Sequence, residues 1–356
     1  MRTRMAGRGR RRLMAVLLVA ATALVACAPV EEQPTPDPVV ITPDVIADKG
    51  NPPDPVLPVT WPLTGVVGEV AQRPAMSIKI ENSPAARPQT GLEQADVVWE
   101  EMVEGGITRF NVVYHSSLPE IVGPVRSVRP MDAGISAPLG GLLVFSGGQQ
   151  QFVQGIRDAG LQVISNDEGA GGFYRTSDRR APHNLYGRTA DFLLQADGAH
   201  SSPPAPQFSF ARRPELASAS VAGAPASAIA LTFPFASPGW NWDAASGRWL
   251  RTEAGNPAVV ITGQQLSAVN VVVLRVQVRD TGTRDPGGNP VPETVMAGSG
   301  DAFVATGGQS ITGTWSKPDA TSPMVLTGAD GQPLLLAPGN TWVELVPVSG
   351  SSVSIG

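Results

Sequence analysis

Glycine and proline interrupt this chain along its whole length. The sequence holds 39 glycines and 34 prolines among 356 residues, about a fifth of the total. Proline lacks the N–H that a helix interior needs, and glycine favours turns and strained backbone. Charged residues make up 16% of the chain, which is low for a soluble protein. The pattern therefore predicts short strands joined by turns and loops, and it argues against a helical bundle or a coiled coil.

The first 26 residues have the three parts of a lipoprotein signal peptide. Six arginines and no acidic residue precede the apolar run Leu13–Val25, which is too short for a permanent membrane span. Ala26 ends the run, and Cys27, the sole cysteine of the chain, follows it. We expect cleavage after residue 26, a diacylglyceryl group on the Cys27 thiol, and a fatty acid such as palmitate on its amino group. This lipid would anchor the protein to the membrane on its extracytoplasmic side.

The charge of the mature chain excludes one class of partner. Loss of residues 1–26 leaves 20 Lys and Arg against 31 Asp and Glu, a net charge of −11. Nucleic-acid binding needs a basic surface, so no nucleic acid is expected as a partner. Because the one thiol carries lipid, the folded part has no disulfide and depends on its hydrophobic core.

Residues 27–62 are predicted to be the lipidated cysteine followed by a linker. Ten prolines lie between Ala28 and Pro62 among Glu, Asp and Thr. Such a composition cannot bury enough apolar surface to fold, so we expect a disordered, extended tether. At about 3.1 Å per residue it would reach on the order of 100 Å from the membrane, far enough to enter the cell wall.

Behind the linker the hydrophobic pattern predicts an α+β protein with two domains. Residues 63–200 read as a mixed α/β domain, in which strand 142–145, helix 149–159 and strand 161–164 form a βαβ unit. A proline-rich boundary follows at 201–206. Residues 207–349 read as a mostly antiparallel β domain. The other predicted strands are 76–80, 97–103, 109–114, 228–235, 258–261, 270–278, 302–305, 324–326 and 341–346.

Several motifs carry a resemblance to a known family. The first domain contains "IENSPAARPQTGLEQADVVWEEMVEGGITRF", "GPVRSVRP", "FSGG", and "FYR" followed by "APHNLY". The second contains "NVVVLRV", "GSGDAFV", "GTWSKP" and "PGNTWVELVP". Together they resemble the YerB-like lipoproteins, a bacterial two-domain family of unknown function. The resemblance implies two domains and a membrane-anchored location, and it implies no reaction.

Arginines of the first domain form a candidate anion site. Arg126 and Arg129 stand three apart, and Arg175 follows Tyr174 in a cluster that also contains Asn184. A guanidinium matches the geometry of carboxylates and phosphates and stays charged at physiological pH. The ligand would be an anionic wall polymer or an envelope partner. The alternative is that these arginines pair with Glu81, Glu100 or Glu104 and brace the fold.

A glycine-rich turn is a second part of this candidate site. Ser146, Gly147 and Gly148 lie between a predicted strand and a predicted helix. Free backbone N–H groups at such a turn, together with the helix dipole, favour a negatively charged ligand. The motif is short, and by itself it is weak evidence.

A cell-wall glycan or peptide hydrolase or transferase is the alternative function. Glu100 and Glu104 would share one face of a strand and could flank a cleft as paired carboxylates. His183 and His115 are candidate general bases. The alternative for these residues is an ion pair or a hydrogen-bonded brace. The chain has no Gly-x-Ser-x-Gly elbow, so whether it is an enzyme stays open.

The sequence predicts neither a metal nor a cofactor. It holds three histidines without metal-ligand spacing, and it has no phosphate-binding loop or dinucleotide fingerprint. Trp240 and Trp242 lie two apart on a predicted strand and could stack on sugars. We expect them instead to be part of the core of the second domain.

Overall fold

The computed structural model describes residues 57–356, and residues 56–356 form one compact unit. Cys27 and most of the predicted linker lie outside the described residues. The last linker positions contact the folded body: Thr60 bridges to Val67, and the Trp61 ring lies 5.1 Å from the His115 ring. Within residues 57–356, no helix is both long and apolar enough to cross a membrane.

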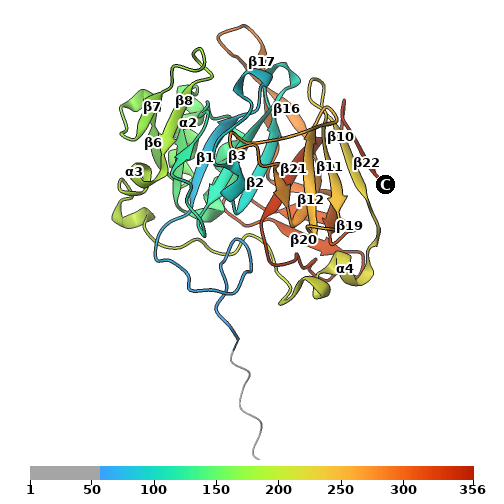
Figure 1. Ribbon diagram of the computed structural model, residues 1–356. Coiled ribbons are helices and arrows are strands. Elements are labelled where there is room, and N and C mark those ends of the chain that lie inside the picture. The colour runs from blue at the N-terminus through green and yellow to red at the C-terminus, as the bar shows by residue number, and fades with distance from the viewer. Residues whose placement is uncertain (1–56) are drawn as a thin grey trace, which may run out of the picture. The chain divides into compact units, whose positions relative to one another are not determined.

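One mixed sheet of eleven strands contains both halves of the chain (Figure 1). Its centre is the parallel pair β2 and β21, in which Val97 lies opposite Thr341 and Glu100 opposite Glu344. The predicted domains therefore share a single sheet. Along the sheet the strands are β20 (Val325–Gly328), β19 (Gln309–Lys317), β18 (Gly298–Thr306), β15 (Asn270–Val276), β21 (Thr341–Pro347), β2 (Val97–Met102), β3 (Thr108–Tyr114), β1 (Met76–Glu81), β5 (Leu142–Phe145) and β6 (Gln162–Ser165), with β9 (Ala224–Pro225) beside β19.

The first half contributes a βαβ unit at one end of this sheet. Strands β5 and β6 are parallel, and α2 (Gln150–Asp158) connects them. Helix α2 buries Phe152, Val153 and Ile156, the apolar face that its sequence spacing indicates. The remaining α-helices are short: α1 (Met131–Ser136), α3 (Thr189–Leu193) and α4 (Ser218–Ala222).

A second sheet packs on the main sheet, and the core between them contains residues of both halves of the chain. Trp240 and Trp249 are buried, and the Trp240 ring lies 5.2 Å from that of Trp342 on the main sheet. Trp240 therefore belongs to the core, as expected, whereas Trp242 is only partly buried and packs against that core. Residues 258–261 were predicted to be a strand, but they form only isolated β-bridges. The sheet consists of β13 (Asn256–Pro257), β12 (Arg248–Glu253), β11 (Pro238–Asp243), β10 (Ala228–Thr232), β22 (Ser352–Ile355) and β14 (Ser267–Ala268).

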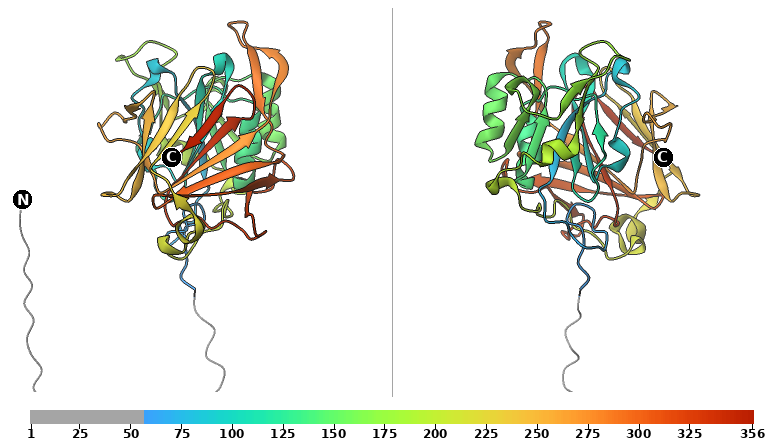
Figure 2. Two further views of the ribbon diagram at one scale, coloured as in Figure 1. Left: turned by 90° about the vertical axis from the view of Figure 1, so that its right-hand side faces the viewer. Right: turned by 60° about the vertical axis from the view of Figure 1, so that its left-hand side comes forward.

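Two small sheets complete the fold. One of them is the hairpin formed by β16 (Val278–Arg284) and β17 (Pro290–Thr294). This hairpin stands out from the body in both views of Figure 2. The other small sheet consists of β4 (Ile121–Val122), β8 (Leu185–Arg188) and β7 (Phe173–Arg175).

Candidate functional site

Charged side chains gather where three neighbouring strands of the main sheet reach the same edge. Arg109 on β3 is the register partner of Glu81 on β1 and of Glu101 on β2. Register partners project to the same face of a sheet, so these three side chains share one face. Strand β5 is parallel to β1 and ends at this edge as well. In open sheets, the carboxyl ends of parallel strands are the usual place for a ligand.

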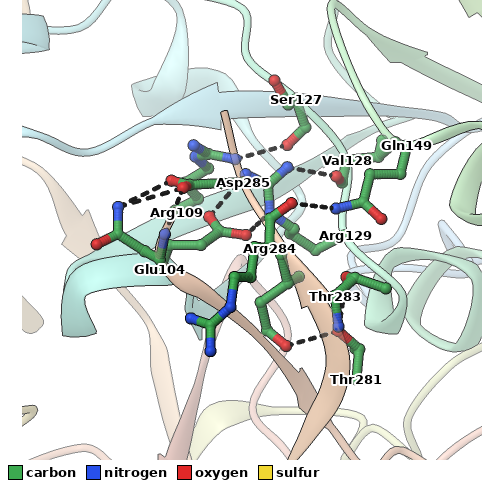
Figure 3. A network of polar contacts seen from close by, with 12 residues as sticks. Glu104, Arg109, Ser127, Val128, Arg129, Gln149, Thr281, Thr283, Arg284 and Asp285 are labelled. Carbon is green, nitrogen blue, oxygen red and sulfur yellow. Dashed lines mark hydrogen bonds and ion pairs between the residues drawn. The ribbon is translucent and has the colours of Figure 1, made fainter. Parts of the chain in front are cut away.

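Arg109 is buried at this edge without a carboxylate partner. The residue is 7% exposed, its Nη1 donates to the Ser127 carbonyl at 3.0 Å, and its Nε has no partner. Among residues 57–356 no carboxylate lies within ion-pair distance of it. Burial, and next the charge of Arg129, lower the pKa of Arg109 to about 10. Figure 3 shows Arg109 beside Arg129, with Asp285 of the β16–β17 turn nearby.

Arg126 and His183 meet at the carboxylate of Glu81. Arg126 Nε lies 3.4 Å from Glu81 Oε2, and the Arg126 side chain is 25% exposed. His183 Nδ1 lies 2.9 and 3.0 Å from the two carboxylate oxygens. The His183 side chain is 28% exposed, and its Nε2 has no hydrogen-bond partner in the described part of the chain. Arg126 and His183 thus form the solvent-facing part of the site.

Arg129 is already occupied by Glu104. Its Nε and Nη2 both contact the Glu104 carboxylate, the latter at 2.6 Å, and both side chains are buried. Glu104 lies beyond the end of β2, in the turn η3 (Glu104–Gly106), where two glycines adopt φ of 70° and 69°. Glu104 therefore does not continue the strand alternation that was expected to place it beside Glu100.

Glu100 points to the opposite face of β2 and is fully buried. Arg251 donates from Nη2 to Glu100 at 2.6 Å and from Nη1 to Glu344 at 2.9 Å. Register partners Glu100 and Phe110 both face the core between the sheets. The two glutamates expected to flank one cleft are thus separated by the sheet, and each is paired with an arginine.

A buried lysine, Lys79, lies on the same face of the sheet as Arg109, deeper in the protein. Lys79 Nζ contacts Glu101 and lies 2.9 Å from Asp132, and both carboxylates are fully buried. Burial, and next the charge of Asp132, raise the pKa of Glu101 to about 7. When every group is ionised, this face carries equal numbers of positive and negative side chains. The cations are Lys79, Arg109, Arg126 and Arg129, and the acids are Glu81, Glu101, Glu104 and Asp132.

The glycine-rich turn after β5 already binds an internal carboxylate. The Gly147 N–H contacts the Asp167 carboxylate, and Ser146 Oγ donates to Asp167 at 3.3 Å. Gly148 supports close packing, because a Cβ there would lie 2.8 Å from Val128. The backbone donor that was expected to hold an external anion is therefore engaged by the protein itself.

The remaining predicted residues form a separate group on β7 and the loop that follows it. Arg175 donates to the Asn184 side chain at 2.8 Å, and Asn184 donates to the Thr176 carbonyl at 2.7 Å. The Arg188 guanidinium lies 4.6 Å from the centre of the Tyr174 ring. This group positions the loop that carries His183, and it does not contact Arg126.

Arg109 and Arg251 were not predicted as site residues from the sequence. The available signal was an arginine inside an apolar strand, since Arg109 precedes the run Phe110–Tyr114, which is buried throughout. His115, the other candidate base, is fully buried beneath Trp61. Within residues 57–356, no three acidic, histidine or cysteine side chains are placed to hold a metal ion.

These observations define a protein that is built on one mixed β-sheet and has a buried arginine at the edge of that sheet. Residues 63–202 match the family model described as "Protein of unknown function (DUF3048) N-terminal domain", and residues 229–343 match its C-terminal counterpart. The chain belongs to this family, which confirms the resemblance drawn from the motifs.

Two comparisons identify relatives in Bacillus subtilis. "Putative lipoprotein YerB" of strain 168 is 33% identical over 147 residues, which cover 40% of this chain and 44% of that protein. The alignment therefore spans less than half of the relative. The crystal structure of the YerB protein matches with a TM-score of 0.70 at 24% identity, over 83% of this chain and 99% of that one. The two proteins share the fold.

Proposed function

We propose that this protein is a lipid-anchored envelope protein whose first half binds an anionic wall polymer through Arg109 and Arg126. The observation that carries the proposal is the burial of Arg109 without a carboxylate partner. A guanidinium removed from water destabilises a fold unless its charge is compensated. A phosphate or carboxylate of the ligand would supply that compensation in bidentate geometry.

The arrangement around Arg109 supports a site that is reached from one side. Arg126 is partly exposed next to Arg109, so an anion held by Arg126 would reach the inner guanidinium. Arg129 is fixed by Glu104 and by a hydrogen bond from its backbone N–H to Asp132 at 2.6 Å. Its charge favours an anion nearby, while its own side chain stays in place.

The position of the site suits a protein that is tethered at its N-terminus. The start of the described chain lies at one end of the body, and the β16–β17 hairpin beside Arg129 lies at the other (Figures 1 and 2). With a lipid on Cys27, an extended tether on the order of 100 Å would bring the site within reach of the wall. The name of the Bacillus relative is consistent with such an anchor.

Binding is tested with residues 56–356 and purified cell-wall sacculi. The unit should pellet with sacculi, and Arg109→Gln or Arg126→Gln should lower the bound fraction by about tenfold. Arg157→Gln is the matched control, because Arg157 is an exposed arginine paired with Glu168. Equal pelleting of all four proteins, or no pelleting of the wild type, would overturn the proposal.

The anchor is tested separately in cells that make the full chain. Wild-type protein should incorporate labelled palmitate and fractionate with membranes. Cys27→Ser should lose both properties, because no other thiol exists in the chain. Membrane association that persists without label would contradict the predicted lipidation.

A hydrolase or transferase is the second candidate, and the His183–Glu81 pair favours it. Glu81 would orient the imidazole and leave Nε2 as a base toward solvent. Soluble wall fragments released from sacculi, detected by mass spectrometry and absent with His183→Ala, would establish this activity. Pelleting without fragments supports binding alone. Glu100 and Glu104 take no part in this candidate, because both are paired with buried or nearly buried arginines.

A further inference from the structure

A cavity of about 380 Å³ lies between the two halves of the chain. It is bounded by the segment around Arg87 on one side and by β12, β13 and the residues after them on the other. Its volume falls in the range of small-molecule sites. Phe110 lines it, whereas its neighbour Arg109 points to the anion site. The cavity is therefore distinct from that site, on the opposite face of β3.

The polar groups of the cavity are held in fixed positions. Glu253 accepts hydrogen bonds from Arg251 at 2.6 Å, from Asn82 at 3.3 Å and from Arg87 at 3.1 Å. Arg251 and Asn82 are buried, and Arg251 also lies over the Trp342 ring, 4.7 Å from its centre. Side chains that are fixed before binding lose little conformational entropy when a ligand arrives.

The charges around the cavity cancel. Arg87 and Arg251 face Glu100 and Glu253, which gives two cations and two carboxylates. The fifth group, Glu344, is fully buried, and burial and next the charge of Glu100 raise its pKa well above the usual value. This direction favours the neutral form of Glu344, so the cavity is lined by nearly balanced charges. An ion entering the cavity would lose water without meeting an uncompensated opposite charge.

One donor and one acceptor remain available side by side. Arg87 uses Nε and Nη2 for Asn82 and Glu253, while its Nη1 has no partner among the described residues. Glu253 Oε2 accepts only from Arg87 and keeps acceptor capacity. Two adjacent hydroxyl groups could accept from Nη1 and donate to Oε2. Ala258 and Leu266, both buried, add apolar walls for C–H groups.

We propose that this cavity binds a neutral sugar, with vicinal hydroxyls on the Arg87–Glu253 pair and its apolar face against Phe110 and Leu266. The ligand is the size of a monosaccharide or the terminal unit of a glycan. This site is independent of the anion site, and both would face polymers of the same wall.

Titration calorimetry of residues 56–356 tests the proposal with four probes. N-acetylglucosamine and glucose are the neutral sugars, and glucuronate and glucosamine are their charged counterparts. We expect saturable binding of at least one neutral sugar, and affinity about tenfold lower for its charged counterpart because of uncompensated desolvation. Arg126→Gln should leave sugar binding unchanged, so failure of the anion site and failure of this site are distinguishable.

Val259→Trp is the variant that blocks the cavity. Val259 lines the cavity and is 36% exposed, so a larger side chain there fills the entrance without disturbing the buried charges. Val221→Trp, on exposed α4 away from the cavity, is the matched control. Sugar binding should be lost in the first variant and kept in the second. Binding that survives Val259→Trp, equal affinity for charged sugars, or no saturable binding of either neutral sugar would each overturn the proposal.

Discussion

Glu81 and Arg109 lie opposite each other on β1 and β3, yet they do not pair. Glu81 is engaged by Arg126 and His183, and Arg109 donates to the Ser127 carbonyl. A carboxylate and a guanidinium at register partners would ordinarily form a cross-strand ion pair. Their separation leaves Arg109 buried without a carboxylate in ion-pair contact among residues 57–356, and this is the feature on which the proposed anion site rests.

Replacing Arg109 should show that its burial opposes folding. In Arg109→Met, a desolvated charge is exchanged for an apolar side chain, so we expect the free energy of unfolding to stay within about 1 kcal/mol of wild type or to rise. Anion binding should be lost. Urea denaturation of residues 56–356 measures the first effect. A large loss of stability would mean that Arg109 has a structural role.

Arg129 provides the contrasting case in the same region. Arg129→Met leaves the buried Glu104 carboxylate without its partner, and we expect stability to fall by about 3–5 kcal/mol. The same denaturation series compares the two variants directly. If both behave alike, the distinction between a paired and an unpaired arginine is wrong.

Glu101 should make stability depend on pH. Its pKa is raised from 4.5 to about 7 in the folded protein, so the folded state holds this proton more tightly than the unfolded state. The contribution is fully present below pH 4.5 and is lost as pH rises through 7, up to about 3 kcal/mol in total. Glu101→Gln should flatten this part of the stability curve. Denaturation at intervals between pH 5 and 8 tests it, and an unchanged slope in the variant would contradict the assignment.

The same proton should influence the anion site. Protonated Glu101 leaves one positive charge in excess on its face of the sheet, so sulfate, which does not titrate in this range, should bind more tightly at pH 6 than at pH 8. Calorimetry on the wild type and on Glu101→Gln measures how much of the pH dependence of sulfate binding requires Glu101. Equal pH dependence in both proteins would show that Glu101 is not the linked group.

Replacing Ala254 with asparagine should stabilise the protein. Ala254 adopts φ of 48° and Gly255 adopts 79° in the two-residue turn between β12 and β13, where Glu253 pairs with Asn256. Such turns favour Asn-Gly, because L-residues other than Asn and Asp are strained there. Ala254→Asn should stabilise by about 1 kcal/mol, which raises Tm by about 2–4 °C. Ala254→Val should lower Tm, and calorimetric melting of both variants checks the sign.

The first half of the chain should not fold alone. Without the second half, β2 loses its partner β21, and Glu100 loses Arg251. We expect residues 56–202 to lack a cooperative thermal transition, and residues 207–356 added in trans to restore one. Circular dichroism measures both. A sharp transition of the isolated first half would mean that the shared sheet is dispensable.

Individual strands and helices were predictable from the hydrophobic pattern of adjacent residues. Strand 142–145 coincides with β5, and predicted helix 149–159 contains α2. The apolar alternation and the single amphipathic face are properties of a few adjacent residues, so the sequence alone indicates them. Strand β19 was not predicted, because its exposed positions Thr312, Thr314 and Ser316 are polar and Gly313 interrupts it.

The pairing of distant segments was not predictable. Strand β2 meets β21 across more than 240 positions of sequence, and no spacing rule specifies that register. For the same reason the sequence offered Glu81, Glu100 and Glu104 as partners for arginines without saying which pairs form. Glu100 pairs with Arg251, which lies on β12 in the other half of the chain.

The central position of β21 has a consequence for the order in which the protein is made. Residues 97–100 leave the ribosome long before residues 341–344, to which they pair. Until β21 is made, the growing chain carries an open edge of Val97, Val98 and Trp99, three apolar residues able to join a wrong strand. Correct folding therefore depends on the last tenth of the polypeptide, and a truncated product would expose this edge permanently.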